Sequence, residues 1–337
     1  MTDPAILSAE PSAPAPAGAS RLRRALAPIL LLAMIAIAFA LSFTQPSQQA
    51  LTDSLTTMIH SGVKSREPWA LAQAAMAMGL RALLHSTETM VLIGAFLVVE
   101  IALAGRPRSW RVVAFAALLQ LGVTVLFYAT WPLLNIYLPM TLGIGPLLPI
   151  DQSQVAAVLG PFAAPVLAIC AILIFSFFVY WAHRAQHQIP FWWRFHAVHH
   201  SIEDLDSVNC YVHPGDWVIE RVFQTLAAVL IGFTFDTVLW LAAFNAIRDR
   251  LIHSRAPIHL GPLRPILIDN RHHFIHHTID FAQSGRNFGT YVSLWDRVFG
   301  TYAAPQPGPL PATGLGHKLP PRTLKQFVLA RLDDRPR

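Results

Sequence analysis

Histidine dominates the chemistry that this sequence can perform. Twelve of the fifteen histidines fall between residues 183 and 277. Eight of these twelve form three clusters. One is an H-x-x-x-H and two are H-x-x-H-H, made by His183 and His187, by His196, His199 and His200, and by His273, His276 and His277. Imidazole nitrogen binds Zn, Cu, Fe and Ni, so these clusters predict a metal site.

The spacing inside the clusters predicts two metal ions rather than one. Residues three or four apart lie on one face of a helix, so each cluster can direct at least two imidazoles at one ion. Adjacent residues point in different directions, so His199 and His200, or His276 and His277, can serve different ions. Eight imidazoles exceed the four to six ligands that one such ion takes. A redox role favours iron, although spacing does not exclude zinc.

Other histidines have weaker signals. His253 follows an apolar segment and is predicted as a ninth ligand from a different direction. His213 and His272 are further candidates, as ligands or as partners of ligands. The isolated His60, His85 and His317 are given no role, because a lone histidine is usually structural.

Motifs of several other enzyme classes are missing from the sequence. It contains no H-E-x-x-H, no G-x-S-x-G and no P-loop, which argues against a zinc metalloprotease, a serine hydrolase and a P-loop NTPase. The two cysteines, Cys170 and Cys210, are far apart and form no C-x-x-C, so a thiolate metal site is excluded.

The composition predicts that these histidines are carried by membrane-spanning helices. The chain is 54% hydrophobic and only 13% charged, against about 25% charged residues in a soluble domain. A helix needs about 20 apolar residues to cross a bilayer. Four segments approach this length, at 25–43, 87–104, 112–131 and 155–182. A fifth, 218–247, is broken near 232–236 and predicts either one long span or, as we prefer, two half-length helices that enter and return. Residues 51–86 are expected to form an interfacial or extra-membrane helix.

Arginines indicate the orientation of the spans. They flank the first span, the loop between the second and third, and the end of the fourth, at Arg21, Arg23, Arg24, Arg106, Arg108, Arg111, Arg184 and Arg194. Positive residues mark the cytoplasmic side, so residues 183–217 are predicted there and a returning hairpin would bring the histidine clusters together. We therefore attribute the net charge of +6 to topology and expect no nucleic-acid partner.

These features divide the chain into four parts. Residues 1–20, rich in Ala, Pro and Ser, are expected to be a disordered tail, and 21–150 an N-terminal transmembrane region of about three spans, the first an uncleaved anchor rather than a signal peptide. Residues 151–303 are the expected catalytic domain and 304–337 a Pro-rich basic cytoplasmic tail. The predicted fold is all-α, an integral-membrane helical bundle with a cytoplasmic, histidine-rich di-metal cap.

The order of these motifs resembles the fatty acid hydroxylase / sterol desaturase superfamily over roughly 170–303. The shared patterns are H-R-x-x-H at 183–187, W-x-x-H-x-x-H-H-S at 193–201, H-P at 213–214, H-S at 253–254, H-x-x-H-H at 273–277, N-F-G at 287–289 and W-D-x-x-F-G-T at 295–301. Arg255 stands where the family usually has Asn, and Asn270 where it often has Pro. Asp249 stands where one branch has a further histidine, so it is either a carboxylate ligand or a partner of Arg248 or Arg250.

The resemblance implies a function. The family binds two iron ions near the cytoplasmic face and uses O2 to oxidise a lipid. We therefore expect hydroxylation, or else desaturation, of a lipid that enters from the bilayer, with zinc as an alternative metal. Electrons from NAD(P)H would arrive through a separate carrier, a cytochrome b5-like protein or a ferredoxin with its reductase. Asp296 is expected to support the ligands or to anchor the C-terminal segment with Trp295.

Two other functions remain open at this stage. A histidine-rich membrane protein can transport or bind metal without oxygen chemistry, although its histidines would then line a path across the bilayer. A degenerate, inactive scaffold is the other alternative, and the three intact clusters argue against it.

Overall fold

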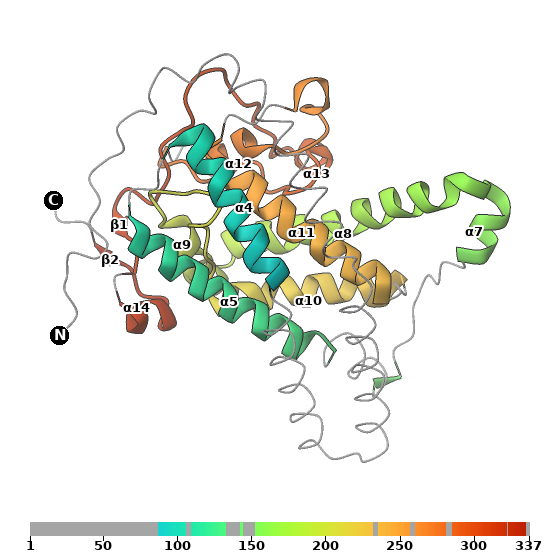
Figure 1. The fold of residues 1–337 in the computed structure, drawn as a ribbon, viewed down its shortest axis with the longest axis horizontal. Helices are drawn as coiled ribbons and strands as arrows, with labels where there is room; N and C mark the ends of the chain where they lie inside the picture. The colour runs from blue at the N-terminus through green and yellow to red at the C-terminus, as the bar shows by residue number, and fades with distance from the viewer. Residues whose placement is uncertain are drawn as a thin grey trace.

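The computed structural model describes residues 87–105, 109–132, 142–143, 152–231, 235–256, 260–280, 285–321 and 323–334. These residues are almost entirely helical (Figure 1), which confirms the helical class. The helices are α4 (Thr87–Ala104), α5 (Trp110–Pro132), α7 (Gln152–Leu159), α8 (Ala163–Gln188), α9 (Pro190–His200), α10 (Pro214–Ile231), α11 (Phe235–His253), α12 (Asn270–His276), α13 (Leu294–Val298) and α14 (Leu324–Val328). Two 3-10 turns, Gly160–Phe162 and Gly261–Leu263, and a sheet of β1 (Lys318–Leu319) and β2 (Asp333–Asp334) complete the described part. The predicted tail 1–20, first span 25–43 and stretch 51–86 lie outside these residues.

The apolar stretch predicted as one span at 155–182 is divided in the structure. Helix α7 ends at Leu159, and the chain turns through Gly160 with a φ of +52° before Pro161. Glycine adopts positive φ readily, and proline has no backbone N–H to continue a helix. Helix α8 then begins at Ala163 and extends to Gln188, so it includes the first histidine cluster.

Helices α8, α9 and α10 pack against one another, and α11 packs on α4 and α12. In Figure 1, α7 and the first part of α8 extend away from the remaining helices. One apolar cluster joins Phe175 and Val179 of α8 to Ala227 of α10 and Leu241 of α11. This cluster holds the long helices together beside the histidine-bearing ends of α8 and α11.

The break expected near 232–236 separates α10 from α11, with 232–234 outside the described residues. The start of α10 and the end of α11 both reach the same histidine-rich region. Asp216, in the first turn of α10, contacts His196, and His253, the last residue of α11, contacts His199. The chain therefore leaves this region along α10 and returns along α11.

Within the described residues, one helical stretch, Pro165–Gln188, is long and apolar enough to cross a membrane. Two other predicted spans, 87–104 and 112–131, overlap the apolar stretches Gly94–Ala104 and Trp110–Gly122. Both stretches are shorter than Pro165–Gln188.

The C-terminal segment packs onto α5 and α9. Phe327 of α14 and Ala330 are buried in a cluster that includes Val113, Val198 and Tyr211. Arg194 of α9 donates a hydrogen bond to the Leu329 carbonyl at 2.8 Å. Residues 304–337 were expected to lack a core of their own, and the structure shows that they contribute to the core formed by α5 and α9.

Candidate metal centre

The helices place nine histidines at one end of the bundle. The C-terminal end of α8 carries His183 and His187, which are four residues apart and share a face. The end of α9 carries His196, His199 and His200, and α11 ends at His253. Helix α12 carries His273 and His276, and His277 caps its C-terminus. These are the nine histidines predicted as ligands from the sequence.

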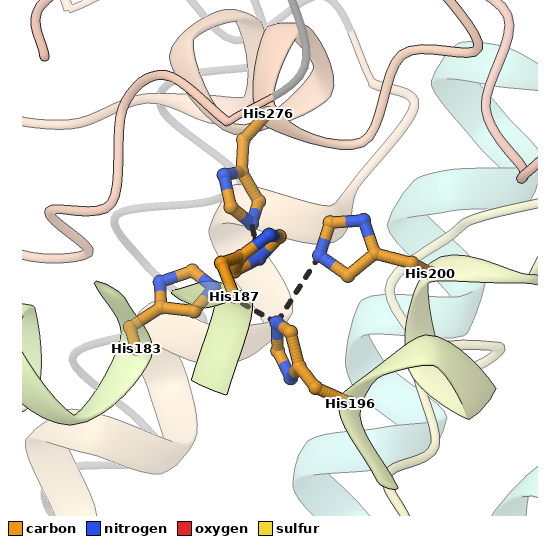
Figure 2. Close-up of side chains that lie close together, drawn as sticks. All are labelled: His183, His187, His196, His200 and His276. Carbon is orange, nitrogen blue, oxygen red and sulfur yellow. Dashed lines mark hydrogen bonds between the residues drawn. The ribbon is translucent and has the colours of Figure 1, made fainter. Parts of the chain in front are cut away.

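Five of them form the first group, which we call the five-histidine group (Figure 2). Its members are His183, His187, His196, His200 and His276, drawn from α8, α9 and α12. One ring nitrogen of each lies within 4.8 Å of those of all the others. The Nε2 atoms of His183 and His196, of His200 and His196, and of His187 and His276 are each 3.1 Å apart.

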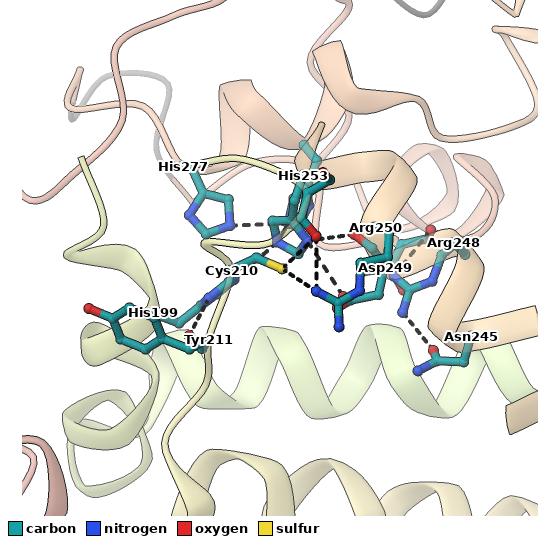
Figure 3. Close-up of polar contacts among 12 residues, drawn as sticks. His199, Cys210, Tyr211, Asn245, Arg248, Asp249, Arg250, His253 and His277 are labelled. Atoms are coloured by element: carbon teal, nitrogen blue, oxygen red, sulfur yellow. Dashed lines mark hydrogen bonds and ion pairs between the residues drawn. The ribbon is translucent and has the colours of Figure 1, made fainter. Parts of the chain in front are cut away.

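The other four form the second group, the four-histidine group. Its members are His199, His253, His273 and His277, from α9, α11 and the end of α12, and all four are buried. Successive Nε2 atoms are 3.2 Å apart from His199 to His253, 2.9 Å from His253 to His273 and 3.1 Å from His273 to His277. Figure 3 shows three members of this group, His199, His253 and His277.

The hydrogen bonds on the far side of the rings define which nitrogen carries the proton. A carbonyl oxygen only accepts, so a ring nitrogen beside one must be N–H. The Nδ1 atoms of His199 and His253 donate to the carbonyls of Tyr211 and Asp249, at 3.1 and 2.7 Å. When both rings are neutral, their Nε2 atoms are therefore unprotonated, and each directs a lone pair at the other across 3.2 Å. Two lone pairs repel each other unless a cation lies between them.

The donor set fits a metal ion in each group. Metal–nitrogen bonds of about 2.0–2.1 Å place neighbouring ligand atoms about 2.9–3.4 Å apart, which matches the observed 2.9–3.2 Å. Burial, together with the neighbouring histidines, lowers the pKa of His196 to about 3, of His199 to about 4 and of His253 to about 3. Ligand imidazoles must be neutral, and these are.

A carboxylate positions one ligand of the five-histidine group. The His196 Nδ1 lies 3.0 and 3.1 Å from the two carboxylate oxygens of Asp216, which is 2% exposed. Gln186 donates to the same carboxylate. Burial raises the pKa of Asp216 to about 8, and a cation on the His196 Nε2 would lower it again. This is the carboxylate–histidine arrangement that orients metal-bound imidazoles.

A loop held by Asp296 positions two more ligands of that group. The Nδ1 atoms of His183 and His276 each donate, at 2.8 Å, to the carbonyls of Phe288 and Arg286. The Asp296 carboxylate accepts the backbone N–H groups of Phe288 and Gly289 at 2.8 Å. It also accepts the Thr301 hydroxyl at 2.7 Å. Asp296 therefore lies behind the loop rather than at the metal site.

Two further candidate histidines lie outside both groups. The Nδ1 atom of His213 accepts the Gly215 N–H at 2.9 Å, and its Nε2 donates to the Val328 carbonyl at 3.1 Å. Both nitrogens are thus engaged, and the ring connects α10 to the C-terminal segment. The Nδ1 atom of His272 is 2.8 Å from the carboxylate of Asp269 in the capping box that begins α12. Neither ring points at a metal position.

Asp249 also lies outside the two groups. Its carbonyl accepts from the Nδ1 of His253, and its carboxylate is 3.6 Å from the same nitrogen. That nitrogen is on the opposite edge of the ring from Nε2, so Asp249 supports His253 from behind. Cys210 is near both residues, but burial raises the pKa of its thiol, which accepts from Arg250 (Figure 3) and Gln120.

Sequence reasoning did not single out two residues of this region. Asp216 lies in the first turn of α10, two residues after the H-P motif, where an isolated acid indicates a helix start. Glu100 is an acid within the apolar segment 87–104. Its buried carboxylate contacts Ser254 and Arg255, directly after His253. An acid inside an apolar helix was the available signal, since such a charge is costly without a partner.

The segment that carries these histidines is similar to known proteins. The family model described as Fatty acid hydroxylase matches residues 168–301, from α8 to just beyond α13. Over these residues the chain is similar to a fatty acid hydroxylase domain. The match begins within α8, so part of the predicted fourth span belongs to the domain.

Curated relatives extend the comparison to lipid enzymes. The ornithine lipid hydroxylase OlsE of Rhizobium tropici is 31% identical over 138 residues, 41% of this chain and 42% of the relative. Human alkylglycerol monooxygenase is 28% identical over 149 residues, 43% of this chain and 32% of the relative. The Delta(7)-sterol-C5(6)-desaturase of Nicotiana tabacum is 28% identical over 139 residues, 40% of this chain and 48% of the relative.

The fatty acid hydroxylase domain is thus the shared part. In each of these three alignments, the matched segment spans less than half the length of the relative. No solved structure matches this chain.

Proposed function

We propose that this protein is a membrane di-iron oxidoreductase that uses O2 and external electrons to hydroxylate an unactivated C–H bond of a lipid. Desaturation is the alternative outcome of the same C–H oxidation. The proposal joins the geometry of the two histidine groups to the fatty acid hydroxylase domain and to the names of its relatives.

One observation carries the metal part of the proposal. The nine predicted ligands converge in two buried groups, and the His199 and His253 rings turn lone pairs toward each other. We assign one iron to each group. Bound iron would supply the one-electron and O2 chemistry that amino-acid side chains lack. The protein's own part is to keep the imidazoles neutral, to hold the Nδ1 atoms of five of them on carbonyls or on the Asp216 carboxylate, and to shield the site from water.

Exposed apolar side chains support a lipid substrate taken from a bilayer. On α10, Val218, Val222 and Leu226 are spaced four residues apart and are 45–46% exposed, so they form one apolar stripe. On α8, which packs against α10, Val166 and Ile169 are also exposed. We propose that these faces contact lipid and that the histidine end of the bundle lies at the cytoplasmic surface, with α10 and α11 entering and leaving from that side.

Hydroxylation is the preferred outcome because two of the three relatives compared above are named as a hydroxylase or a monooxygenase. We propose that electrons reach the irons from NAD(P)H through a separate carrier, either a cytochrome b5-like protein or a ferredoxin with its reductase. The lipid would present its reacting carbon to the metal pair while its apolar part stays in the bilayer.

The test uses the full chain purified in detergent and reconstituted anaerobically with Fe(II). With NAD(P)H, a surrogate ferredoxin and reductase, and mixed lipids, we expect oxygen consumption and a lipid that gains one oxygen atom or loses two hydrogens. The His200→Ala variant is the matched control and should consume no oxygen in lipid oxidation. Metal flux into proteoliposomes without lipid oxidation would instead favour a transporter.

A further inference from the structure

A buried carboxylate outside the fatty acid hydroxylase domain contacts the chain next to the four-histidine group. Glu100 lies on α4, which packs against α11, and is 1% exposed. Its Oε2 accepts the Ser254 hydroxyl at 2.5 Å. Its Oε1 accepts the Arg255 backbone N–H at 2.5 Å and lies 3.3 Å from the Arg255 Nε.

The segment that Glu100 contacts joins two ligand-bearing elements. Residues 254–256 directly follow His253. The Asn270 amide donates to the carbonyls of Ser254 and Ala256, both at 2.7 Å. Asn270 begins α12, which carries His273. Glu100 and Asn270 thus both hold 254–256, and this segment is hydrogen-bonded to the start of α12.

Two of the positions at which this chain departs from the family pattern take part in these contacts: Arg255 is a partner of Glu100, and Asn270 is a partner of the 254–256 segment. Arg255, where Asn is usual, supplies the charge that a buried carboxylate needs. Asn270, where Pro is frequent, supplies an amide that Pro lacks. The departures and the acid on α4 therefore form one connected set of contacts.

From these contacts we propose that Glu100 is a positioning residue of the metal centre: through 254–256 it holds His253 in register with His273, so the N-terminal region helps to build the four-histidine group. The inference rests on the proposed metal-binding function. It assigns α4 a role in metal binding in addition to any role in membrane insertion. The five-histidine group has no ligand on α11 and only His276 on α12, so it should depend far less on Glu100.

The test compares metal binding by the wild-type chain with that of Glu100→Ala and Glu100→Gln in detergent. We expect the wild type to hold two metals and Glu100→Ala to hold about one, with the second metal bound about tenfold or more weakly. Glutamine keeps one oxygen that can accept the Arg255 N–H, and its amide N–H can donate to the Ser254 hydroxyl oxygen, so Glu100→Gln should recover most of the second metal. Stoichiometry is measured by elemental analysis and affinity by competition with a chelator.

A matched control separates positioning from general stability. Val99→Ala shortens a buried apolar side chain on the same helix, next to Glu100, without removing a polar contact. Measured well below each variant's melting temperature, Val99→Ala should retain two metals. Equal metal loss in Val99→Ala and Glu100→Ala would overturn the proposal, as would wild-type affinity in Glu100→Ala.

A milder variant keeps the test valid if Glu100→Ala does not fold. Ser254→Ala removes only the hydroxyl donor and should weaken the second metal severalfold, leaving the first unchanged. An unchanged second metal in Ser254→Ala would then overturn the proposal. A wild-type chain that binds no metal would instead overturn the proposed function itself, so the two failures are distinguishable.

Discussion

The two histidine groups share a helix pair and a set of neighbouring rings, yet the protein supports them differently. In the five-histidine group, His196 is held by the Asp216 carboxylate. His183 and His276 of that group are held by carbonyls of a loop that Asp296 fastens. In the four-histidine group, His199 and His253 are held by main-chain carbonyls. The Nδ1 atoms of its other two members, His273 and His277, are buried without a hydrogen-bond partner among the described residues.

The difference teaches that ligand number and ligand support are separate properties. The first group has five donors and carboxylate support from inside the fatty acid hydroxylase domain. The second has four donors, fewer supports, and a connection to Glu100 on a helix outside the domain. Since partners behind a ligand raise its affinity for metal, we expect the five-histidine group to bind the more tightly of the two.

The largest effect should come from removing a ligand, and two adjacent histidines allow one test for each group. His276→Ala removes a ligand of the five-histidine group, and His277→Ala one of the four-histidine group. Each variant should insert into the membrane and retain about one metal. Lipid oxidation should fall by more than about a hundredfold, which exceeds the roughly 10–100-fold loss expected when only a residue behind a ligand is removed. Activity that survives both substitutions would contradict the ligand assignment.

The next effect concerns the carboxylate that distinguishes the five-histidine group. Asp216→Asn keeps the shape of the side chain but removes its charge behind His196, so metal affinity or activity should fall about 10–100-fold. Asp269→Asn is the matched control, because Asp269 is also buried and hydrogen-bonded to a histidine, His272, which is outside both groups. Asparagine caps helices as well as aspartate does. Equal metal loss in both variants would show that Asp216 has no special role.

Stepwise metal removal sharpens the comparison directly. If support sets affinity, a chelator should remove one metal per chain before the other, with dissociation constants about tenfold apart. The His277→Ala variant should lack the phase that is lost first, and His276→Ala should retain it. The measurement is residual metal against chelator concentration, and a single phase removing both metals together would contradict the difference between the groups.

The smallest effect on metal binding should come from His213. Its two hydrogen bonds join α10 to the C-terminal segment, so His213→Ala should cost about 2 kcal/mol of stability and leave metal content unchanged. The melting temperature and elemental analysis of the same sample test this. Loss of metal without loss of stability would place His213 in the metal centre after all.

Much of this site could be predicted from sequence because helical periodicity is local. The spacing within 183–187, 196–200 and 273–277 was enough to predict shared faces, two groups, and the adjacent residues that divide between them. The break between α10 and α11 was also predictable, since Gly232 interrupts the apolar run, but the two helices are 18 and 19 residues long and not half-length as expected. Ligation by these histidines remains a prediction that metal analysis must test.

The supporting residues could not be predicted in the same way. Asp216, Glu100 and the carbonyls of Arg286 and Phe288 reach their partners through tertiary packing, over sequence separations that carry no periodic signal. Gly160 and Pro161 did carry a local signal for the break between α7 and α8, but the continuous hydrophobicity around them concealed it. His213 was ambiguous because a histidine that makes two structural hydrogen bonds looks the same in sequence as a ligand.

Metal stoichiometry tests the central claim most directly. The wild-type chain, purified in detergent and reconstituted anaerobically with Fe(II), should contain two iron ions per chain after unbound metal is removed, one for each histidine group. Fewer than one metal per chain after this treatment would contradict the account of both groups.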